Sequence, residues 1–182
     1  PQDLYFTDAT RQDGRAKQQL RLYAMMSLEA LFMEMKAAGY EDVSVTSAYR
    51  SYSYQEQLFN QYLAQYNGDY EKVSSFSNPP GSSEHQTGLC VDMHNWPTAG
   101  RYMADDFAAS DAGKWLAENC YRFGFILRYP AGKEELTGTA ATDTVIRYVG
   151  VPHAAYMNDF GLCLEEYFRI LNTQEALKEP PQ

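Results

Sequence analysis

The chain has 182 residues, of which 45% are hydrophobic and 21% charged, which is enough to build one globular domain with a sizeable core. Its formal net charge of -9 and its pI of about 4.8 argue against nucleic acid or an anionic membrane surface as a partner, since both require clustered Lys and Arg. No stretch approaches the roughly 20 apolar residues of a membrane span, and no basic start followed by an apolar run marks a signal peptide. Whether a leader or anchor was trimmed before Pro1 stays open.

The N-terminal half predicts two helices separated by a strand. Apolar residues recur at helical spacing from about 13 to 36. The β-branched alternation of residues 43–46 predicts a short strand, and Ser53 is the expected N-cap of a second helix over 53–65. Residues 74–88 are rich in Ser, Asn, Pro and Gly, and this composition predicts a loop.

The C-terminal half alternates strands with helices. Strands are expected over 89–93, 125–129 and 145–149, and helices over 111–122, from Pro152 and over 162–171. The tail 172–182 ends in Pro-Pro-Gln and is expected to fray. No internal repeat divides the chain, so residues 1–182 are expected to form a single domain of the α+β class, with a small antiparallel sheet flanked by helices.

Three cysteines exclude a fully paired set of intramolecular disulfides. Cys90 lies in an apolar run and is expected to be a buried free thiol. The sequence allows a disulfide bond between Cys120 and Cys163 but does not decide whether the bond forms.

Residues 83–94 read Ser-Glu-His-Gln-Thr-Gly-Leu-Cys-Val-Asp-Met-His and hold most of the candidate chemistry. His85 leaves a loop, and Asp92 lies within an apolar strand, where an ionised carboxylate is costly to bury without a partner. A metal ion is one such partner, and a histidine nitrogen with a carboxylate suits zinc. The alternative from the residues alone is that His85 closes a loop while Asp92 accepts backbone hydrogen bonds.

This stretch resembles the metal motif of the LAS-type zinc peptidases, the group that includes the VanY-like D-Ala-D-Ala carboxypeptidases. Three more segments resemble the family in the same order: Ser-Ala-Tyr-Arg-Ser-Tyr at 47–52, the run 115–130, and Arg-Tyr-Val-Gly at 147–150. The resemblance covers about residues 15–171. It implies the LAS-type zinc peptidase fold.

The resemblance also implies a zinc-dependent D,D-carboxypeptidase that removes terminal D-Ala from peptidoglycan stem peptides, in an extracytoplasmic setting. By position, His85 and Asp92 would be two ligands of the Zn²⁺ ion. Arg50 would be a catalytic and substrate-binding residue, pairing with the terminal carboxylate of the substrate or with the developing oxyanion. Further substrate-binding positions are Tyr49, Ser83 and Gln86.

The chain departs from the family pattern at the last motif. The third ligand and the general base of the family come from Glu-Pro-Trp-His directly before Arg-Tyr-Val-Gly, and here Thr142 and Val145 stand at the Glu and His positions. Valine has no metal-binding atom, and threonine is no general base near neutral pH. His94 is the preferred substitute ligand, because it shares a strand face with Asp92, and His153 is the alternative.

For the general base, Asp143 is preferred over Glu84, which is expected to face solvent. The function then has two main interpretations. The preferred one is a zinc peptidase with a relocated ligand and base, and the other is a catalytically inactive relative that binds stem peptides. A D,D-dipeptidase or L,D-carboxypeptidase is a third possibility, because the loops that decide substrate length are not readable from the sequence.

Overall fold

A computed structural model of the chain describes residues 1–95 and 105–176, and these form two antiparallel sheets with helices around them. The larger sheet has the strand order β3 (Val43–Ser47), β4 (Cys90–Asn95), β6 (Thr142–Tyr148), β5 (Phe125–Tyr129). The smaller sheet pairs β1 (Leu4–Phe6) with β2 (Gln19–Arg21). This mixture of helices and small antiparallel sheets confirms the predicted α+β class.

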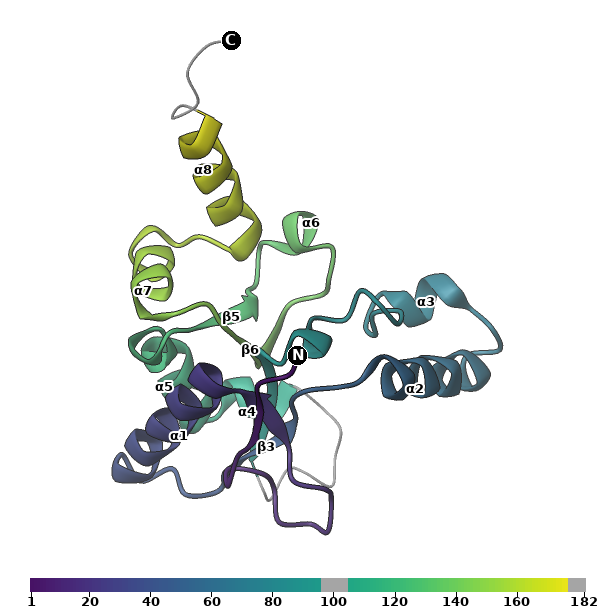
Figure 1. The fold of residues 1–182 in the computed structure, drawn as a ribbon, viewed down its shortest axis with the longest axis horizontal. Coiled ribbons are helices and arrows are strands. Elements are labelled where there is room, and N and C mark those ends of the chain that lie inside the picture. The colour runs from purple at the N-terminus through teal and green to yellow at the C-terminus, as the bar shows by residue number, and fades with distance from the viewer. Residues whose placement is uncertain (96–104, 177–182) are drawn as a thin grey trace.

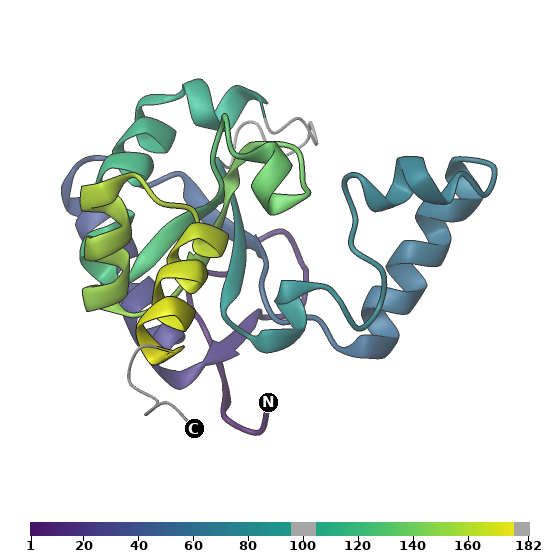
Figure 2. The same cartoon turned by 90° about the horizontal axis from the view of Figure 1, so that it is seen from above.

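The helices gather on two sides of the larger sheet (Figures 1 and 2). They are α1 (Leu22–Ala37), α2 (Tyr52–Gln65), α3 (Tyr70–Ser74), α4 (Asp105–Ala109), α5 (Asp111–Asn119), α6 (Glu134–Thr137), α7 (Val151–Phe160) and α8 (Leu164–Ala176), with 3₁₀ turns η1 (Glu84–Thr87) and η2 (Cys120–Phe123). Helices α1 and α5 cover one face, α7 and α8 pack on the edge strand β5, and α2 and α3 form an arm that projects from the other side (Figure 1).

The main core lies between the larger sheet and helices α1 and α5. Alternate residues of each strand point to this side because side chains of a strand have a period of two. Val45, Met93 and Ile146 from three strands are fully buried there, against Leu28 of α1 and Leu116 of α5. A smaller cluster packs α7 and α8 against β5. The opposite face of the sheet carries charged residues, Asp92 and Arg147 among them.

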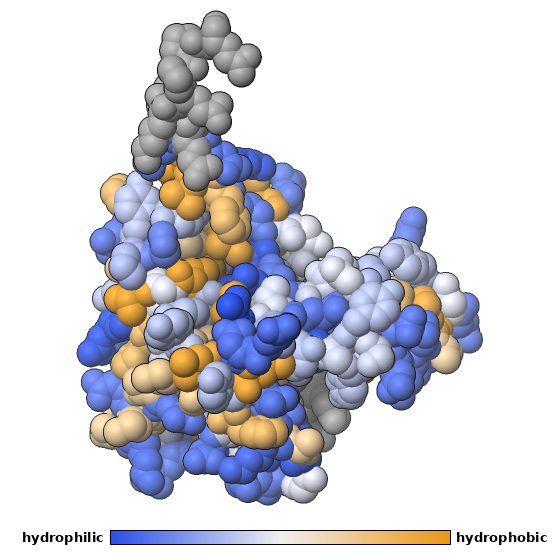
Figure 3. Space-filling view, in the orientation of Figure 1, coloured by the Kyte–Doolittle hydropathy of each residue, from blue (hydrophilic) through white to orange (hydrophobic). Residues whose placement is uncertain are grey.

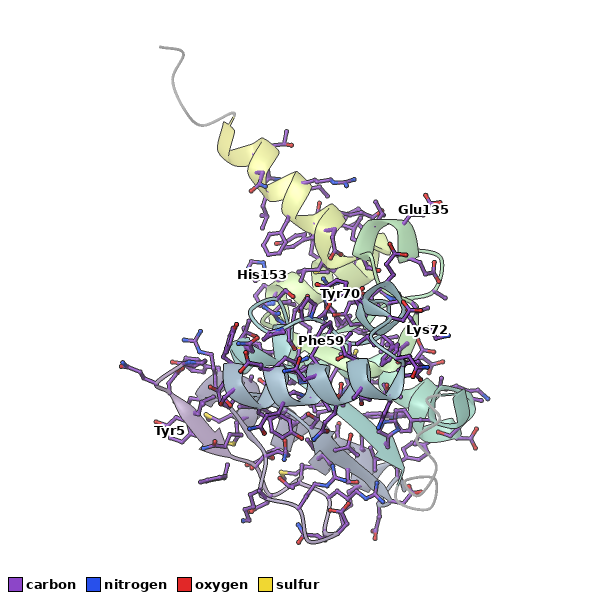
Figure 4. All side chains as sticks on the ribbon, turned by 90° about the vertical axis from the view of Figure 1, so that its right-hand side faces the viewer. Tyr5, Phe59, Tyr70, Lys72, Glu135 and His153 are labelled. Atoms are coloured by element: carbon purple, nitrogen blue, oxygen red, sulfur yellow. The ribbon has the colours of Figure 1, made fainter. Side chains whose placement is uncertain are left out.

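The arm is held together by aromatic side chains. The rings of Phe59 in α2 and Tyr70 in α3 meet edge to face with centroids 5.5 Å apart (Figure 4). Helix α2 begins after Ser51, whose hydroxyl accepts a hydrogen bond from the Tyr54 amide. The predicted N-cap Ser53 is therefore wrong by two residues, because Ser51 is the residue whose extended backbone aims its oxygen at the first turn.

Several predicted boundaries are wrong. The helix expected from residue 13 begins at Leu22, because residues 19–21 pair with β1 as a strand. The loop expected over 74–88 contains η1, and β6 begins at Thr142 rather than at 145. Helix α8 runs to Ala176, so residues 172–176 are not frayed, and the rest of the predicted tail lies outside the described residues.

All three cysteines are free and buried. The prediction for Cys90 is confirmed, and Cys120 does not pair with Cys163. Within the described ranges, the helices are too short or too polar to cross a membrane.

Candidate functional site

A cleft lies on the face of the larger sheet that points away from α1. One hollow is lined by residues from the α2–α3 arm, from η1, from β4 and from β6. A second hollow continues toward the loop before β2, and the two share Arg50, Leu58, Tyr62 and Asp92 in their linings. The arm stands out from the body in the space-filling view (Figure 3), and its residues Leu58 and Tyr62 line both hollows. We call these two hollows together the cleft.

The turn at Gly88 brings His85 and Asp92 to the same place. Gly88 ends η1 with φ +71°, in the left-handed region that favours glycine. A Cβ at this position would lie 3.0 Å from a methyl group of Leu4 and 3.1 Å from Arg21 Cγ, so space as well as conformation selects glycine. The chain then enters β4, and Asp92 faces the imidazole that the turn has just positioned.

His85 and Asp92 are spaced as two ligands of one metal ion would be. His85 Nδ1 lies 2.7 Å from the carbonyl oxygen of Ala48, so this nitrogen carries the proton and donates it. His85 Nε2 lies 3.2 Å from Asp92 Oδ1. Bonds of about 2.05 Å at a tetrahedral zinc place two donor atoms roughly 3.3 Å apart. The pair therefore fits two corners of a zinc tetrahedron.

Arg50 occupies the other oxygen of the same carboxylate. Its Nη2 lies 2.5 Å from Asp92 Oδ2, and its Nε donates to Ser47 Oγ at 2.8 Å. The remaining Nη1 lies 3.5 Å from Gln55 Oε1, which is a long hydrogen bond. Burial raises the pKa of Asp92, but the neighbouring His85 and Arg50 outweigh it and lower that pKa to about 2. Asp92 is thus ionised at neutral pH, with one oxygen paired to Arg50 and the other beside His85 Nε2.

No third donor joins this pair. Among residues 1–95 and 105–176, no three His, Cys, Asp or Glu side chains are grouped as a metal site requires. Val145 faces Asp92 directly across the β4–β6 ladder and lines the same hollow as His85. Thr142 also lines this hollow, and its hydroxyl lies 2.9 Å from that of Thr144. The residues present therefore do not fit a catalytic zinc site, which has three protein ligands.

Neither substitute histidine completes the site. His94 lines the second hollow on the same strand face as Asp92, as predicted, but it does not form a three-donor group with Asp92 and His85. Burial and the nearby Arg11 lower the pKa of His94. His153 lies in the first turn of α7 (Figure 4), where its Nδ1 is 2.6 Å from Tyr167 Oη.

The remaining predicted site residues divide into two groups. Ser83 is buried and lines the first hollow, and Tyr49 lines the second, so the structure brings both to the cleft. Gln86 and Asp143 are in the lining of neither hollow. The side chain of Gln86 instead accepts a hydrogen bond from the Gly81 amide at 2.8 Å.

A buried ion network behind η1 was missed by the sequence analysis. Glu84 does not face solvent: its carboxylate is 2.6 Å from Arg128 Nε and 2.5 Å from Arg147 Nη1. Arg128 also pairs with Glu165 of α8 at 2.5 Å. Burial raises the pKa of Glu84, but Arg128 and Arg147 lower it further than burial raises it. The two arginines inside apolar strands were the available signal, because such charges need buried partners.

The comparisons with known proteins agree on one family. A family profile described as "VanY: D-alanyl-D-alanine carboxypeptidase" matches residues 17–151. YodJ of Bacillus subtilis, a carboxypeptidase by name, is 35% identical over 92% of this chain. A D-alanyl-D-alanine carboxypeptidase of Enterococcus faecalis is 36% identical over 81% of this chain. The chain spans 61% and 54% of the length of these two relatives.

Solved structures of peptidases have the same fold as this chain. The LdcB LD-carboxypeptidase has a TM-score of 0.83 at 34% identity, with 93% of this chain and 78% of that chain covered. VanYB in complex with D-alanine-D-alanine has a TM-score of 0.74 at 31% identity, with 91% and 87% covered. A mutant VanY in complex with Zn(II) has a TM-score of 0.72 at 31% identity, with 91% and 88% covered.

These findings confirm the predicted LAS-type fold, and they confirm zinc-dependent D-Ala-D-Ala carboxypeptidase as the activity of the family. The match extends over most of this chain and includes both the turn with His85 and the strand with Asp92. The chain belongs to the VanY family of D-alanyl-D-alanine carboxypeptidases.

Proposed function

We propose that this chain recognises peptidoglycan stem peptides that end in D-Ala-D-Ala, the substrate class of its family, in an extracytoplasmic setting. The observation that carries the proposal is the convergence of Arg50, His85 and Asp92 on one wall of the cleft. A VanY relative that covers most of this chain binds D-Ala-D-Ala, and peptidoglycan itself lies outside the cytoplasmic membrane.

Arg50 is the residue that suits the terminal carboxylate of the peptide. Its Nε and Nη2 are held by Ser47 and Asp92, whereas Nη1 has only the long contact to Gln55. A guanidinium fixed at two positions presents its third nitrogen in a defined direction, which favours charge-assisted binding of a carboxylate. The apolar side chains that line the same hollow, Leu58 and Val145 among them, suit the methyl groups of the two D-Ala residues.

Cleavage of the terminal D-Ala is the first candidate for the step after recognition, because it is the reaction of the family. In that case His85 and Asp92 would hold zinc, which supplies an activated water and polarises the scissile carbonyl. The third donor would have to be His94, after a rearrangement. D,D-dipeptidase or L,D-carboxypeptidase specificity belongs to the same candidate.

Recognition without cleavage is the second candidate. It is favoured by a specific observation: Val145 faces Asp92 where a third donor is needed, and Thr142 offers no base near neutral pH. The chain would then be a stem-peptide binding module built on a peptidase fold.

The test is titration calorimetry with a stem pentapeptide ending in D-Ala-D-Ala, together with an assay for released D-Ala. We expect binding by the wild-type chain that falls about tenfold or more when the peptide terminus is amidated or when Arg50 is changed to Gln, because a charge-assisted hydrogen bond is lost. Arg122→Gln is the matched control, since Arg122 is exposed on η2, away from the cleft, where it contacts Asn119 at 3.0 Å and Glu34 at 3.6 Å. Absence of pentapeptide binding would sink the proposal, and release of D-Ala distinguishes the two candidates.

A further inference from the structure

Two neighbouring parts of the first hollow differ in chemistry. One part carries His85 and Asp92, and the adjacent strand β6 carries Thr142 and Val145. Asp92 and Val145 are register partners on neighbouring strands, so their side chains emerge side by side on the cleft face. The position nearest to Asp92 from β6 is therefore an isopropyl group, which contributes no electron pair to a metal ion.

The cation that Asp92 requires is supplied by the chain itself. A carboxylate with only 20% of its side chain exposed is costly to leave uncompensated. Arg50 lies 2.5 Å from one of its oxygens, and its own exposed fraction is 16%. The His85 ring approaches the other oxygen at 3.2 Å. The negative charge of Asp92 is thus offset by the Arg50 guanidinium, while the imidazole lies beside its other oxygen.

Arg50 is itself fixed in this arrangement. Ser47 Oγ accepts from its Nε at 2.8 Å, and Gln55, which is buried, lies beside its Nη1. Gln55 is tied in turn to the carbonyl oxygen of Asn78 at 2.7 Å, which connects the arm to the loop before η1. The guanidinium and the carboxylate form an ion pair whose charges cancel without a metal ion, and the imidazole lies beside it.

We infer that the centre of this chain is a metal-free seat for the peptide terminus, in which Arg50 compensates the charge of Asp92 beside His85 and Val145 closes the third metal position. This inference rests on the proposed recognition of stem peptides. It makes the chain a binding module that holds the D-Ala-D-Ala terminus without hydrolysing it. Stem-peptide binding should then be independent of divalent metal, unlike the activity of a zinc peptidase.

The first measurement is zinc retention. Chelator-treated protein is mixed with zinc, passed through gel filtration and analysed for bound metal, beside His85→Ala. We expect substoichiometric zinc in the wild-type chain, with no further loss in His85→Ala. A double variant, Thr142→Glu with Val145→His, places a carboxylate and an imidazole opposite Asp92 and should retain stoichiometric zinc. Its matched control is Thr142→Gln with Val145→Asn, which has similar side-chain size but neither a base nor an imidazole, and should retain none.

The second measurement is calorimetry with the pentapeptide, with and without chelator, beside the D-Ala release assay. Wild-type binding should be unchanged by the chelator, and D-Ala release should rise at least about 100-fold in the Glu/His double variant, the usual scale of a restored general base. Stoichiometric zinc in the wild-type chain that His85→Ala removes would overturn the inference. A folded double variant that gains no zinc would also overturn it, because Val145 would then not be what closes the site.

Failure of the proposed function has a separate signature. If the wild-type chain binds no pentapeptide with or without chelator, recognition itself is wrong, whatever the zinc measurements show. If the double variant does not fold, the comparison of wild type with His85→Ala still decides whether the native centre holds zinc.

Discussion

The two faces of the larger sheet are built from alternating residues of the same strands but follow different physical rules. On the face toward α1, Met93 and Ile146 are fully buried among other apolar side chains. On the cleft face, their sequence neighbours Asp92 and Arg147 are partly buried and held by opposite charges. The first face is stabilised by the removal of apolar surface from water, and the second by the pairing of charges that are costly to leave alone.

Val145 differs from the charged residues beside it on the cleft face. Val145 is apolar, whereas Arg147, two residues along the same strand, is charged and the cross-strand partner Asp92 is ionised. The comparison of the faces therefore identifies an apolar position beside Asp92, and this position decides whether a metal ion fits there.

The largest expected effect separates two adjacent residues of β6. Ile146→Ala should lower the free energy of unfolding by about 4 kcal/mol, because it opens a cavity in a fully buried site. Val145→Ala should lower it by about 1 kcal/mol or less, since the side chain is half-exposed toward the cleft. Urea denaturation of both variants measures this. Equal losses of unfolding free energy would mean that the two faces contribute to stability in the same way.

A smaller effect is expected from breaking the charge pairing on the cleft face. Asp92→Asn leaves Arg50 without its carboxylate and should lower the free energy of unfolding by about 2 kcal/mol, below the roughly 3–5 kcal/mol of a fully buried pair because these side chains keep some exposure. Asp159→Asn on the exposed side of α7 is the control and should be neutral. A neutral Asp92→Asn measured by urea denaturation would show that Arg50 does not compensate the charge of Asp92 in the way we infer.

The core face could be predicted from the sequence because its signal is local. Alternation in residues 43–46 and the apolar run 125–129 each identify a strand without knowledge of its partners, and the structure has strands at both places. The strands β1 and β2 could not be predicted, because each has three residues and exists only through pairing with the other. The projection of the α2–α3 arm is likewise set by contacts beyond its own periodicity.

The cleft face could be predicted only in part, for the same reason. His85 and Asp92 are seven positions apart, so one motif indicates both. Arg50 meets Asp92 across 42 residues of chain, and Glu84 meets Arg147 across 63, and no local pattern reports such pairings. The sequence did identify the loss of donors at Thr142 and Val145, because position within a known motif was sufficient for that.

The smallest expected effect comes from a surface ion pair that belongs to neither face and is somewhat more exposed than Arg50 and Asp92. Lys133 before α6 lies 2.8 Å from both carboxylate oxygens of Glu166 in α8, and this hydrogen-bonded pairing lowers the pKa of Glu166 to about 2, from an ordinary value of 4.5. Because the folded pKa is depressed, the stabilising contribution is complete above pH 4.5 and is lost as the pH falls from 4.5 toward 2.

We therefore expect Lys133→Gln to be less stable than wild type at pH 7 by a smaller margin than Asp92→Asn, since solvent screens a pair at the surface. The difference should shrink as the pH falls below 4.5, because protonated Glu166 no longer distinguishes the two chains. Urea denaturation over this pH range measures it, with Lys114→Gln as the control, whose partner Asp111 is 4.0 Å away. If Lys133→Gln lowered the free energy of unfolding as much as Asp92→Asn does, charge pairing and not burial would determine how much an ion pair stabilises this protein. The ion pairs of the cleft face would then not differ from those elsewhere on the surface.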